Sequence, residues 1–171
     1  MTTDLRDGGP RYLGVIGPSD ASEDELDLAR AVGREVARSG AILLCGGRGG
    51  VMEAAAQGAH SADLDTPGIV IGILPGSARG DARGPLDYVL ATGLGELRNA
   101  VLVTSCDAVI AVGGSPGTLI EMGYALKASK PLAVISGWSV VESGGSRPAG
   151  VIGARTAEAA VAAVLAALPG D

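Results

Sequence analysis

Short apolar segments alternate with amphipathic segments along almost the whole chain, and this alternation constrains the possible folds more than any other feature. The apolar segments are short and mostly continuous in hydrophobicity, which is typical of parallel strands that are covered on both faces. The predicted strands comprise residues 12–16, 41–45, 69–74, 88–91, 108–112 and 132–135.

The segments between these strands carry the spacing and the boundary signals of helices. Ser22 and Glu25 have the spacing of a capping box at the start of the first helix, and Gly40 follows its end. The predicted helices comprise residues 22–39, 51–61, 94–105, 118–128 and 156–168. This order predicts an α/β fold: a single-domain, Rossmann-like, doubly wound parallel sheet with helices on both faces. We expect the domain to occupy residues 11–171, after a flexible leader of residues 1–10.

The composition disfavours several classes of protein. The chain has 171 residues, which suits one domain, and because it lacks Phe we expect a core of Ala, Val, Leu and Ile. The formal net charge of −6 argues against nucleic-acid binding. No apolar stretch approaches the roughly 20 residues that span a bilayer, and the first residues lack the apolar core of a signal peptide, so no membrane partner and a cytoplasmic location are expected. Cys45 and Cys106 look like buried thiols, not a disulfide framework.

Two segments lie outside the alternation. Residues 75–85 are rich in Gly, Arg and Asp, and residues 139–150 are rich in Gly and Ser. Each is predicted to be either a mobile lid or a surface excursion, and for the second segment the surface excursion is favoured.

Three glycine-containing turns follow the ends of predicted strands. They contain Gly17 and Ser19, then Gly46 and Gly47, then Gly114, Ser115, Gly117 and Thr118. Each turn alone is equally typical of a connection that needs a positive φ angle. The carboxyl ends of parallel strands share one rim, however, so the three turns together predict a phosphate or nucleotide site. The G-x-G-x-x-G fingerprint is absent from the first turn and the Walker sequence is absent from the chain, which disfavours NAD binding and Walker-type ATP hydrolysis.

Two charged side chains are candidates for chemistry near the third turn. Glu121 can form a capping box with Thr118, a structural role that does not exclude catalysis. Arg98 is either a solvated arginine on a helix face or a planar fork that pairs with a phosphate or with Glu121.

The order of these residues resembles the LOG-type proteins, which were long mislabelled as possible lysine decarboxylases. The signature of that family is an arginine, an Asp-Ala before a strand, and P-G-G-x-G-T-x-x-E; here the order is Arg98, Asp107-Ala108, Gly117-Thr118 and Glu121. Residues 46–52 resemble a second element of the family, G-G-x-x-G-[LV]-M, and residues 17–19 resemble its first loop, so the likeness covers most of the chain. It implies a hydrolase of the cytokinin-activating type, which cleaves the N-glycosidic bond of a nucleoside 5′-monophosphate to free base and ribose 5-phosphate.

The resemblance also implies a role for each candidate residue. Arg98 and Glu121 would be catalytic, and Asn99 would contact the sugar. The phosphate and substrate would be held by Gly17, Ser19, Gly46, Gly47, Gly114, Ser115, Gly117 and Thr118. No metal and no cofactor are expected, and the implied partners are a phosphorylated small molecule and a second copy of the chain, in a homodimer or a higher homo-oligomer. A pyridoxal decarboxylase is disfavoured, because the chain offers only Lys127 and Lys130 for a Schiff base.

Two departures from the signature bring the chain closer to a sibling branch that includes the molybdenum-cofactor carrier proteins. Gly113-Gly114-Ser115 stands in place of P-G-G, and Asn99 stands where the family has a lysine. The alternative to a hydrolase is therefore a non-catalytic binder or carrier of a phosphorylated ligand, or a nucleotide-sensing subunit.

Overall fold

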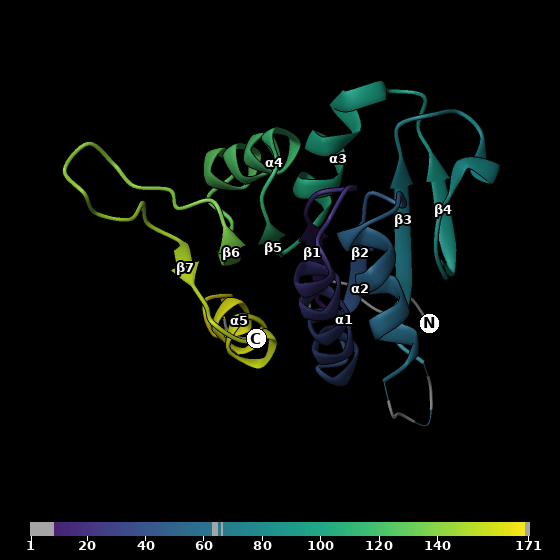
Figure 1. Ribbon diagram of the computed structural model, residues 1–171, viewed down its shortest axis with the longest axis horizontal. Helices are drawn as coiled ribbons and strands as arrows, with labels where there is room; N and C mark the ends of the chain where they lie inside the picture. The colour runs from purple at the N-terminus through teal and green to yellow at the C-terminus, as the bar shows by residue number, and fades with distance from the viewer. Residues whose placement is uncertain (1–8, 63–64, 66, 170–171) are drawn as a thin grey trace.

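The chain forms one parallel sheet of seven strands, in the order β4-β3-β2-β1-β5-β6-β7 (Figure 1). The computed structural model describes residues 9–62, 65 and 67–169, so most of the predicted leader lies outside the described residues. The strands are β1 (Tyr12–Ile16), β2 (Ile42–Cys45), β3 (Val70–Leu74), β4 (Tyr88–Ala91), β5 (Ala108–Gly113), β6 (Leu132–Gly137) and β7 (Val151–Gly153).

The helices cover both faces of the sheet, which confirms the predicted fold class. In Figure 1, α1, α2 and α5 lie on one face, and α3 and α4 lie on the other. Their bounds are α1 (Glu23–Arg38), α2 (Val51–His60), α3 (Arg98–Ser105), α4 (Pro116–Lys127) and α5 (Ala157–Ala166), with short 3₁₀ turns at Arg79–Asp81 and Gly95–Leu97. The capping box of Ser22 and Glu25 is present at the start of α1. Ser39 is the C-cap of this helix, and Gly40 follows it with a φ of +77°.

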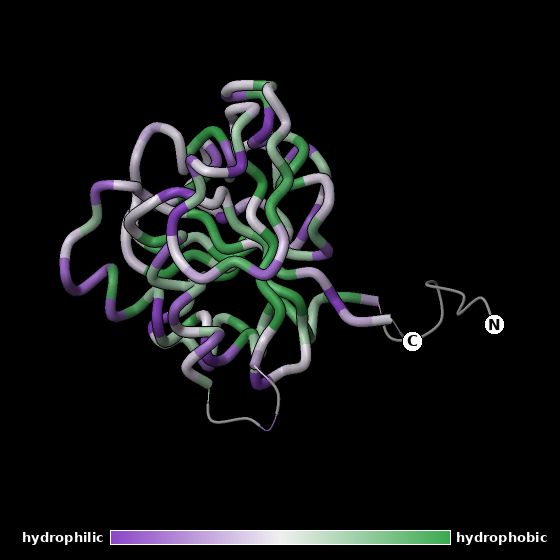
Figure 2. Tube along the Cα trace, turned by 90° about the vertical axis from the view of Figure 1, so that its right-hand side faces the viewer, coloured by the Kyte–Doolittle hydropathy of each residue, from purple (hydrophilic) through white to green (hydrophobic). Residues whose placement is uncertain are grey.

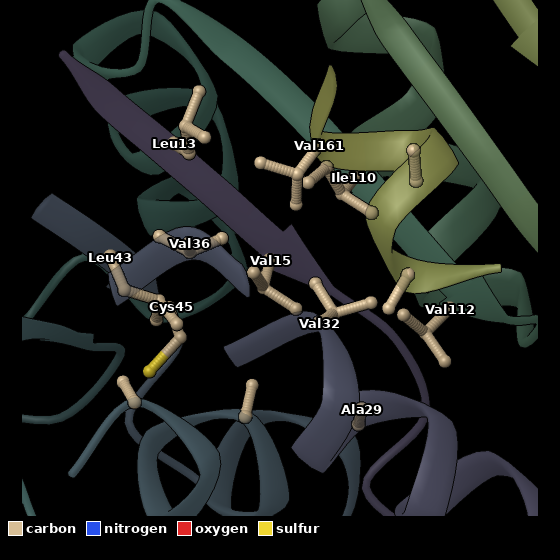
Figure 3. Packing of buried hydrophobic residues seen from close by; sticks show 14 of the residues in the cluster. Leu13, Val15, Ala29, Val32, Val36, Leu43, Cys45, Ile110, Val112 and Val161 are labelled. Atoms are coloured by element: carbon tan, nitrogen blue, oxygen red, sulfur yellow. The ribbon is translucent and has the colours of Figure 1, made fainter. Parts of the chain in front are cut away.

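Two apolar clusters, one on each face of the sheet, form the core. The larger one joins strand residues such as Leu13 and Val15 to Val32 and Val36 of α1 (Figure 3). The smaller one joins the other face of the strands to α3 and α4, with Met122 fully buried between them. In Figure 2 the hydrophobic colour follows the strands through the centre, and the hydrophilic colour gathers on the outer turns. Small side chains thus fill the interior, as the composition predicts.

Close packing of α1 on α2 depends on glycine. A Cβ at Gly33 of α1 would lie 1.9 Å from the carbonyl oxygen of Ala55, and one at Gly58 of α2 would lie 2.0 Å from that of Arg30. No side chain fits at such distances, so the two helices touch backbone to backbone.

The strand β7 is the one element of the sheet that the sequence analysis missed. It has three residues and follows the Gly/Ser-rich segment, which in Figure 1 extends beyond the edge of the sheet. So short a segment carries no readable alternation, and its pairing with β6 is what makes it a strand.

The strand order reverses between β1 and β5. The chain builds β1 to β4 outward in one direction and then returns to add β5 to β7 on the other side of β1. In sheets of this kind, a crevice opens at the carboxyl ends of the two strands where the order reverses. Gly17 follows β1 and Gly113 ends β5, so two of the predicted glycine turns meet at this point.

Candidate functional site

A cavity of about 170 Å³ lies at the reversal point of the strand order. Eight of the residues predicted from the sequence line it: Gly17, Ser19, Arg98, Asn99, Ser115, Gly117, Thr118 and Glu121. The fold therefore brings side chains from the first turn, from α3 and from α4 to one place.

The start of α4 differs from the sequence prediction. The helix begins at Pro116, and its N-cap is Ser115, whose Oγ accepts a hydrogen bond from the backbone N–H of Thr118 at 3.2 Å. The side-chain hydroxyls of Ser115 and Thr118 are 2.9 Å apart, within hydrogen-bond distance. The predicted capping box of Thr118 and Glu121 is therefore wrong. Because proline is favoured at the first helical position, the helix begins at Pro116, two residues before Thr118. Glu121 lies in the second turn of α4, so its carboxylate is not used as a cap.

Glu121 and Arg98 meet inside the cavity and are almost completely buried. Arg98 Nη1 lies 3.7 Å from Glu121 Oε1, and each residue is 7% exposed. The interpretation of Arg98 as a solvated surface arginine is therefore wrong. The distance allows an ion pair but is too long for a good hydrogen bond.

Burial dominates the electrostatics of this pair. It raises the pKa of the Glu121 carboxyl to about 7, although the nearby Arg98 charge acts in the opposite direction. Burial also lowers the pKa of the Arg98 guanidinium, which the charge of Glu121 raises in part. A carboxyl group with a pKa near neutrality can both accept and release a proton at physiological pH, which is the property required of an acid–base catalyst.

Two buried polar atoms in the same place lack a hydrogen-bond partner among the described residues. They are Arg98 Nη1 and Asn99 Oδ1. A buried polar atom left unpaired costs about 1–3 kcal/mol, so native proteins rarely retain one without a reason. Both atoms belong to residues that line the cavity, where a ligand or a water molecule can reach them.

Three predicted residues, Gly46, Gly47 and Gly114, do not line the cavity. A Cβ at Gly46 would lie 2.2 Å from Arg98 Nη1, so the bare backbone at Gly46 makes room for the guanidinium. Gly47, with a φ of +64°, faces Leu74. A Cβ at Gly114 would lie 2.7 Å from the indole of Trp138.

Trp138 packs on the third glycine turn and is a residue that the sequence analysis did not consider. Its Nε1–H donates a hydrogen bond to the backbone carbonyl of Ser115 at 3.0 Å. Ser136 and Gly137, with φ angles of +56° and +104°, turn the chain at the end of β6 just before this residue. No sequence pattern marks such a contact, because the tryptophan lies 23 residues from Ser115.

Three further residues line the cavity beyond those predicted: Arg48, Met52 and Glu96. Arg48 belongs to the second glycine turn, so its place in the sequence could have predicted that it lines the cavity. Glu96 lies in the 3₁₀ turn before α3, and its charge contributes to the raised pKa of Glu121.

The single histidine of the chain, His60, and the two cysteines do not line this cavity. His60 Nε2 lies 2.9 Å from Asp87 Oδ2, and the same Asp87 oxygen accepts a hydrogen bond from the backbone N–H of Val70. Cys45 and Cys106 are free and buried, as predicted. Among the residues that the structure describes, no group of three or more His, Cys, Asp or Glu side chains could hold a metal ion. Within the same residues, no helix is long and apolar enough to cross a membrane.

The fold and the cavity define a Rossmann-like protein with a small polar cavity at the reversal point of its sheet. A model of the SLOG cluster4 family matches residues 10–163, and the chain belongs to this family. An uncharacterized protein of Archaeoglobus fulgidus is 40% identical over 137 residues, which cover 77% of this chain and 87% of that protein.

Two solved structures with related sequences are named for a cofactor that they bind or carry. The molybdenum cofactor binding protein of Rippkaea orientalis is 34% identical with a TM-score of 0.80, over 92% of this chain and 97% of that one. The molybdenum cofactor carrier protein of Chlamydomonas reinhardtii is 34% identical with a TM-score of 0.74, over 92% and 99% of the two chains. The similarity thus extends to the sibling branch that the sequence departures indicate.

Proposed function

We propose that the chain binds a phosphorylated small molecule at the start of α4 and acts as a binder or carrier of that ligand. One observation carries the proposal: the cavity at the reversal point contains a buried arginine and a buried asparagine, each with a polar atom that has no hydrogen-bond partner among the described residues. The similarity to proteins named for binding or carrying the molybdenum cofactor supports a carrier more than an enzyme.

The phosphate would lie on the third glycine turn. Ser115 and Thr118 offer hydroxyl groups there, and Gly117 lines the cavity with no side chain in the way. At the start of α4 Pro116 has no N–H, and the N–H groups of Thr118 and Leu119 bond to Ser115. The N–H of Gly117 and the helix dipole therefore remain to attract an anion. The guanidinium of Arg98 would supply the charge-assisted hydrogen bonds.

A hydrolase is the second candidate, because a carboxyl with a pKa of about 7, such as that of Glu121, can take a proton from water at neutral pH. In that reaction the ionised carboxylate takes a proton from a water molecule, whose oxygen attacks the anomeric carbon of the ribose. The C–N bond breaks, and its electron pair leaves with the base, which is protonated on release. Carboxylates stabilise the positive charge that develops on a sugar in such transition states. Arg98 would hold the phosphate or the carboxylate, and Asn99 would hold the sugar.

The two functions are separated by incubating the protein with AMP and other nucleoside monophosphates and measuring free base. For a carrier we expect ligand binding with no base released, and binding that survives Glu121→Gln. Release of base by the native protein, lost in Glu121→Gln while the fold is retained, would establish the hydrolase instead. Failure to bind either nucleoside monophosphates or inorganic phosphate would refute both.

A homodimer also remains a prediction. Large apolar side chains are exposed around α3 and α4, among them Leu97 at 65% and Ile120 at 50%. A second copy covering this layer would remove them from water, which is favourable by about 25 cal/mol per Å² of apolar surface. Light scattering after size exclusion would give the mass, and Ile120→Asp would shift a dimer of this kind toward the monomer.

A further inference from the structure

The connection from β6 to β7 crosses over the sheet without a helix. Parallel strands are usually joined by a crossover helix that packs on the sheet, as α4 does between β5 and β6. Residues 138–150, all of which the structure describes, instead form turns and irregular backbone, and in Figure 1 they extend beyond the edge of the sheet. The outermost two strands therefore have no crossover helix of their own on the face where α4 packs.

A cavity of about 220 Å³ is lined by this part of the sheet, and we call it the β7 groove. Val134 of β6 and Val151 of β7 line it together with Val140, and all three also pack against the apolar cluster on the α3 and α4 face. Trp138, which is 41% exposed, lines it as well. Small-molecule sites usually measure about 300–1,000 Å³, so the groove is too small for a whole ligand of that kind. It fits a few side chains of a segment that lies across it.

The charges that line the β7 groove are all positive. They belong to Arg147 and Arg155, and none of the lining residues is acidic. Within residues 9–62, 65 and 67–169, neither arginine forms an ion pair or a side-chain hydrogen bond, whereas Arg30 pairs with Asp27 at 2.7 Å. The whole chain has a formal net charge of −6, so the groove is a positive site on a negative molecule. Such a site attracts an acidic partner and disfavours a basic one.

The guanidinium of Arg147 is placed by a glycine of β7. A Cβ at Gly153 would lie 2.4 Å from Arg147 Nη1 and 2.8 Å from Arg147 Cζ. The guanidinium therefore lies against bare backbone, as that of Arg98 does at Gly46. A guanidinium held in this way loses less side-chain freedom when it pairs with a carboxylate.

The strand β7 is the last strand of the sheet and pairs only with β6 among the described strands. The backbone hydrogen bonds at Gly150 and Ala154, on either side of β7, go to β6. Since successive residues of a strand direct their backbone groups to opposite sides, those of Val151 and Gly153 face away from β6. The Val151 N–H bonds to the Pro148 carbonyl at 3.1 Å, which leaves the Val151 carbonyl and the backbone of Gly153 for an added strand.

We propose that the β7 groove is a docking site for an extended acidic segment of another protein. The segment would add to the edge of β7, with its carboxylates on Arg147 and Arg155 and an apolar side chain between them. This inference goes beyond the proposed function, because no residue that lines the groove lines the cavity of Arg98 and Glu121. The two places are nevertheless connected by one side chain, since Trp138 lines the groove and donates a hydrogen bond to the Ser115 carbonyl.

Trp138 is the only tryptophan of the chain, so its fluorescence reports on the groove. The probe is the blocked peptide Ser-Glu-Ser-Leu-Ser-Glu-Ser, in which an extended backbone places both glutamates and the leucine on one face. We expect a saturable change in emission, and none with a peptide that has lysine in place of both glutamates. The affinity should fall at least about tenfold in the double variant Arg147→Ala/Arg155→Ala. High salt should weaken the binding.

The variant Gly153→Ala tests the placement of the guanidinium without removing a charge. Its methyl group would displace the end of the flexible Arg147 side chain, and we expect about threefold weaker binding of the acidic peptide. The matched control is Arg79→Ala, which removes an exposed arginine that does not line the groove. Circular dichroism and urea unfolding establish that each variant keeps the fold.

Saturable binding that is weakened in the double variant and in Gly153→Ala, and kept in Arg79→Ala, supports the inference. Equal binding of the acidic and basic peptides would overturn it, and so would binding that persists in the double variant. Absence of both an emission change and a calorimetric signal would also overturn it. If the native protein is a dimer that the double variant separates into monomers, a second copy occupies the groove and the inference is wrong. Calorimetry with inorganic phosphate, performed in parallel, tests the proposed function alone.

Discussion

Replacing Glu121 by glutamine should change how the stability of the protein depends on pH. The carboxyl has a pKa of about 7 in the folded protein, because burial disfavours its charge, against a usual value of 4.5. Between these two values the unfolded chain releases a proton that the folded protein retains. The free energy of unfolding of the native protein therefore falls as the pH rises through this window.

The size of the effect follows from the two pKa values. The difference between about 7 and 4.5, at about 1.36 kcal/mol for each pH unit, gives a loss of roughly 3 kcal/mol from this group. Below pH 4.5 both states are protonated, and above about 7 both are ionised, so the contribution is constant outside the window. Glu121→Gln has no proton to exchange and lacks this dependence.

The assay is urea unfolding at intervals from pH 4 to pH 8 for the native protein and the variant. The stability of Glu121→Gln minus that of the native protein should rise by roughly 3 kcal/mol between pH 4.5 and 7. The constant cost of losing the pairing with Arg98 shifts this curve without changing its shape. The variant Glu23→Gln measures the general effect of removing one negative charge. A difference curve that stays flat would refute the argument that burial controls Glu121.

Three further substitutions and titrations test other parts of the structure. Gly33→Ala should destabilise the protein by about 1–3 kcal/mol, because its Cβ would lie 1.9 Å from the carbonyl oxygen of Ala55. Urea unfolding measures this loss. The control is Gly123→Ala, at an open position of α4, which should be neutral or stabilising. Gly117→Val should leave stability within about 0.5 kcal/mol, since its Cβ meets no atom closer than 3.8 Å, yet should weaken calorimetric binding of inorganic phosphate at least about tenfold by blocking the turn. Sulfate, which does not titrate near neutrality, should bind more weakly as the pH rises through about 7, because the ionised Glu121 carboxylate then repels it. The affinity of the Glu121→Gln variant for sulfate should not change with pH in this range.

The fold could be predicted from the sequence because each element carries its own local signal. Continuous apolar runs marked six strands, and the capping box of Ser22 and Glu25 marked the start of α1. The strand β7 has only three residues and becomes a strand only by pairing with β6. A local sequence pattern predicts only local structure, whereas β7 exists because of its pairing with β6.

The site was predictable only in part, for the same reason. The residues that line the cavity of about 170 Å³ follow strand ends or lie at helix starts, where topology brings them together. The cap of α4 was assigned to Thr118 instead of Ser115, since both residue types cap helices and the choice depends on where Pro116 begins the helix. The neighbouring cavity of about 670 Å³, which the loop after β3 forms with Arg48 and Glu53, was not predicted. Residues 75–85 were marked as lying outside the alternation, but their position next to α2 depends on the tertiary fold.

The carrier and the hydrolase differ in what they require of one carboxyl group. A hydrolase needs the ionised form of Glu121, which can take a proton from water, whereas a carrier must leave its ligand intact. With a pKa of about 7, the carboxyl is near half protonated at neutral pH, and the protonated form can donate a hydrogen bond to a phosphate or sugar oxygen without repelling it. Ligand binding adds negative charge beside this group and favours the protonated form further, so occupancy itself suppresses the base that hydrolysis needs. Burial of Glu121 therefore suits storage of a phosphorylated ligand at least as well as its cleavage.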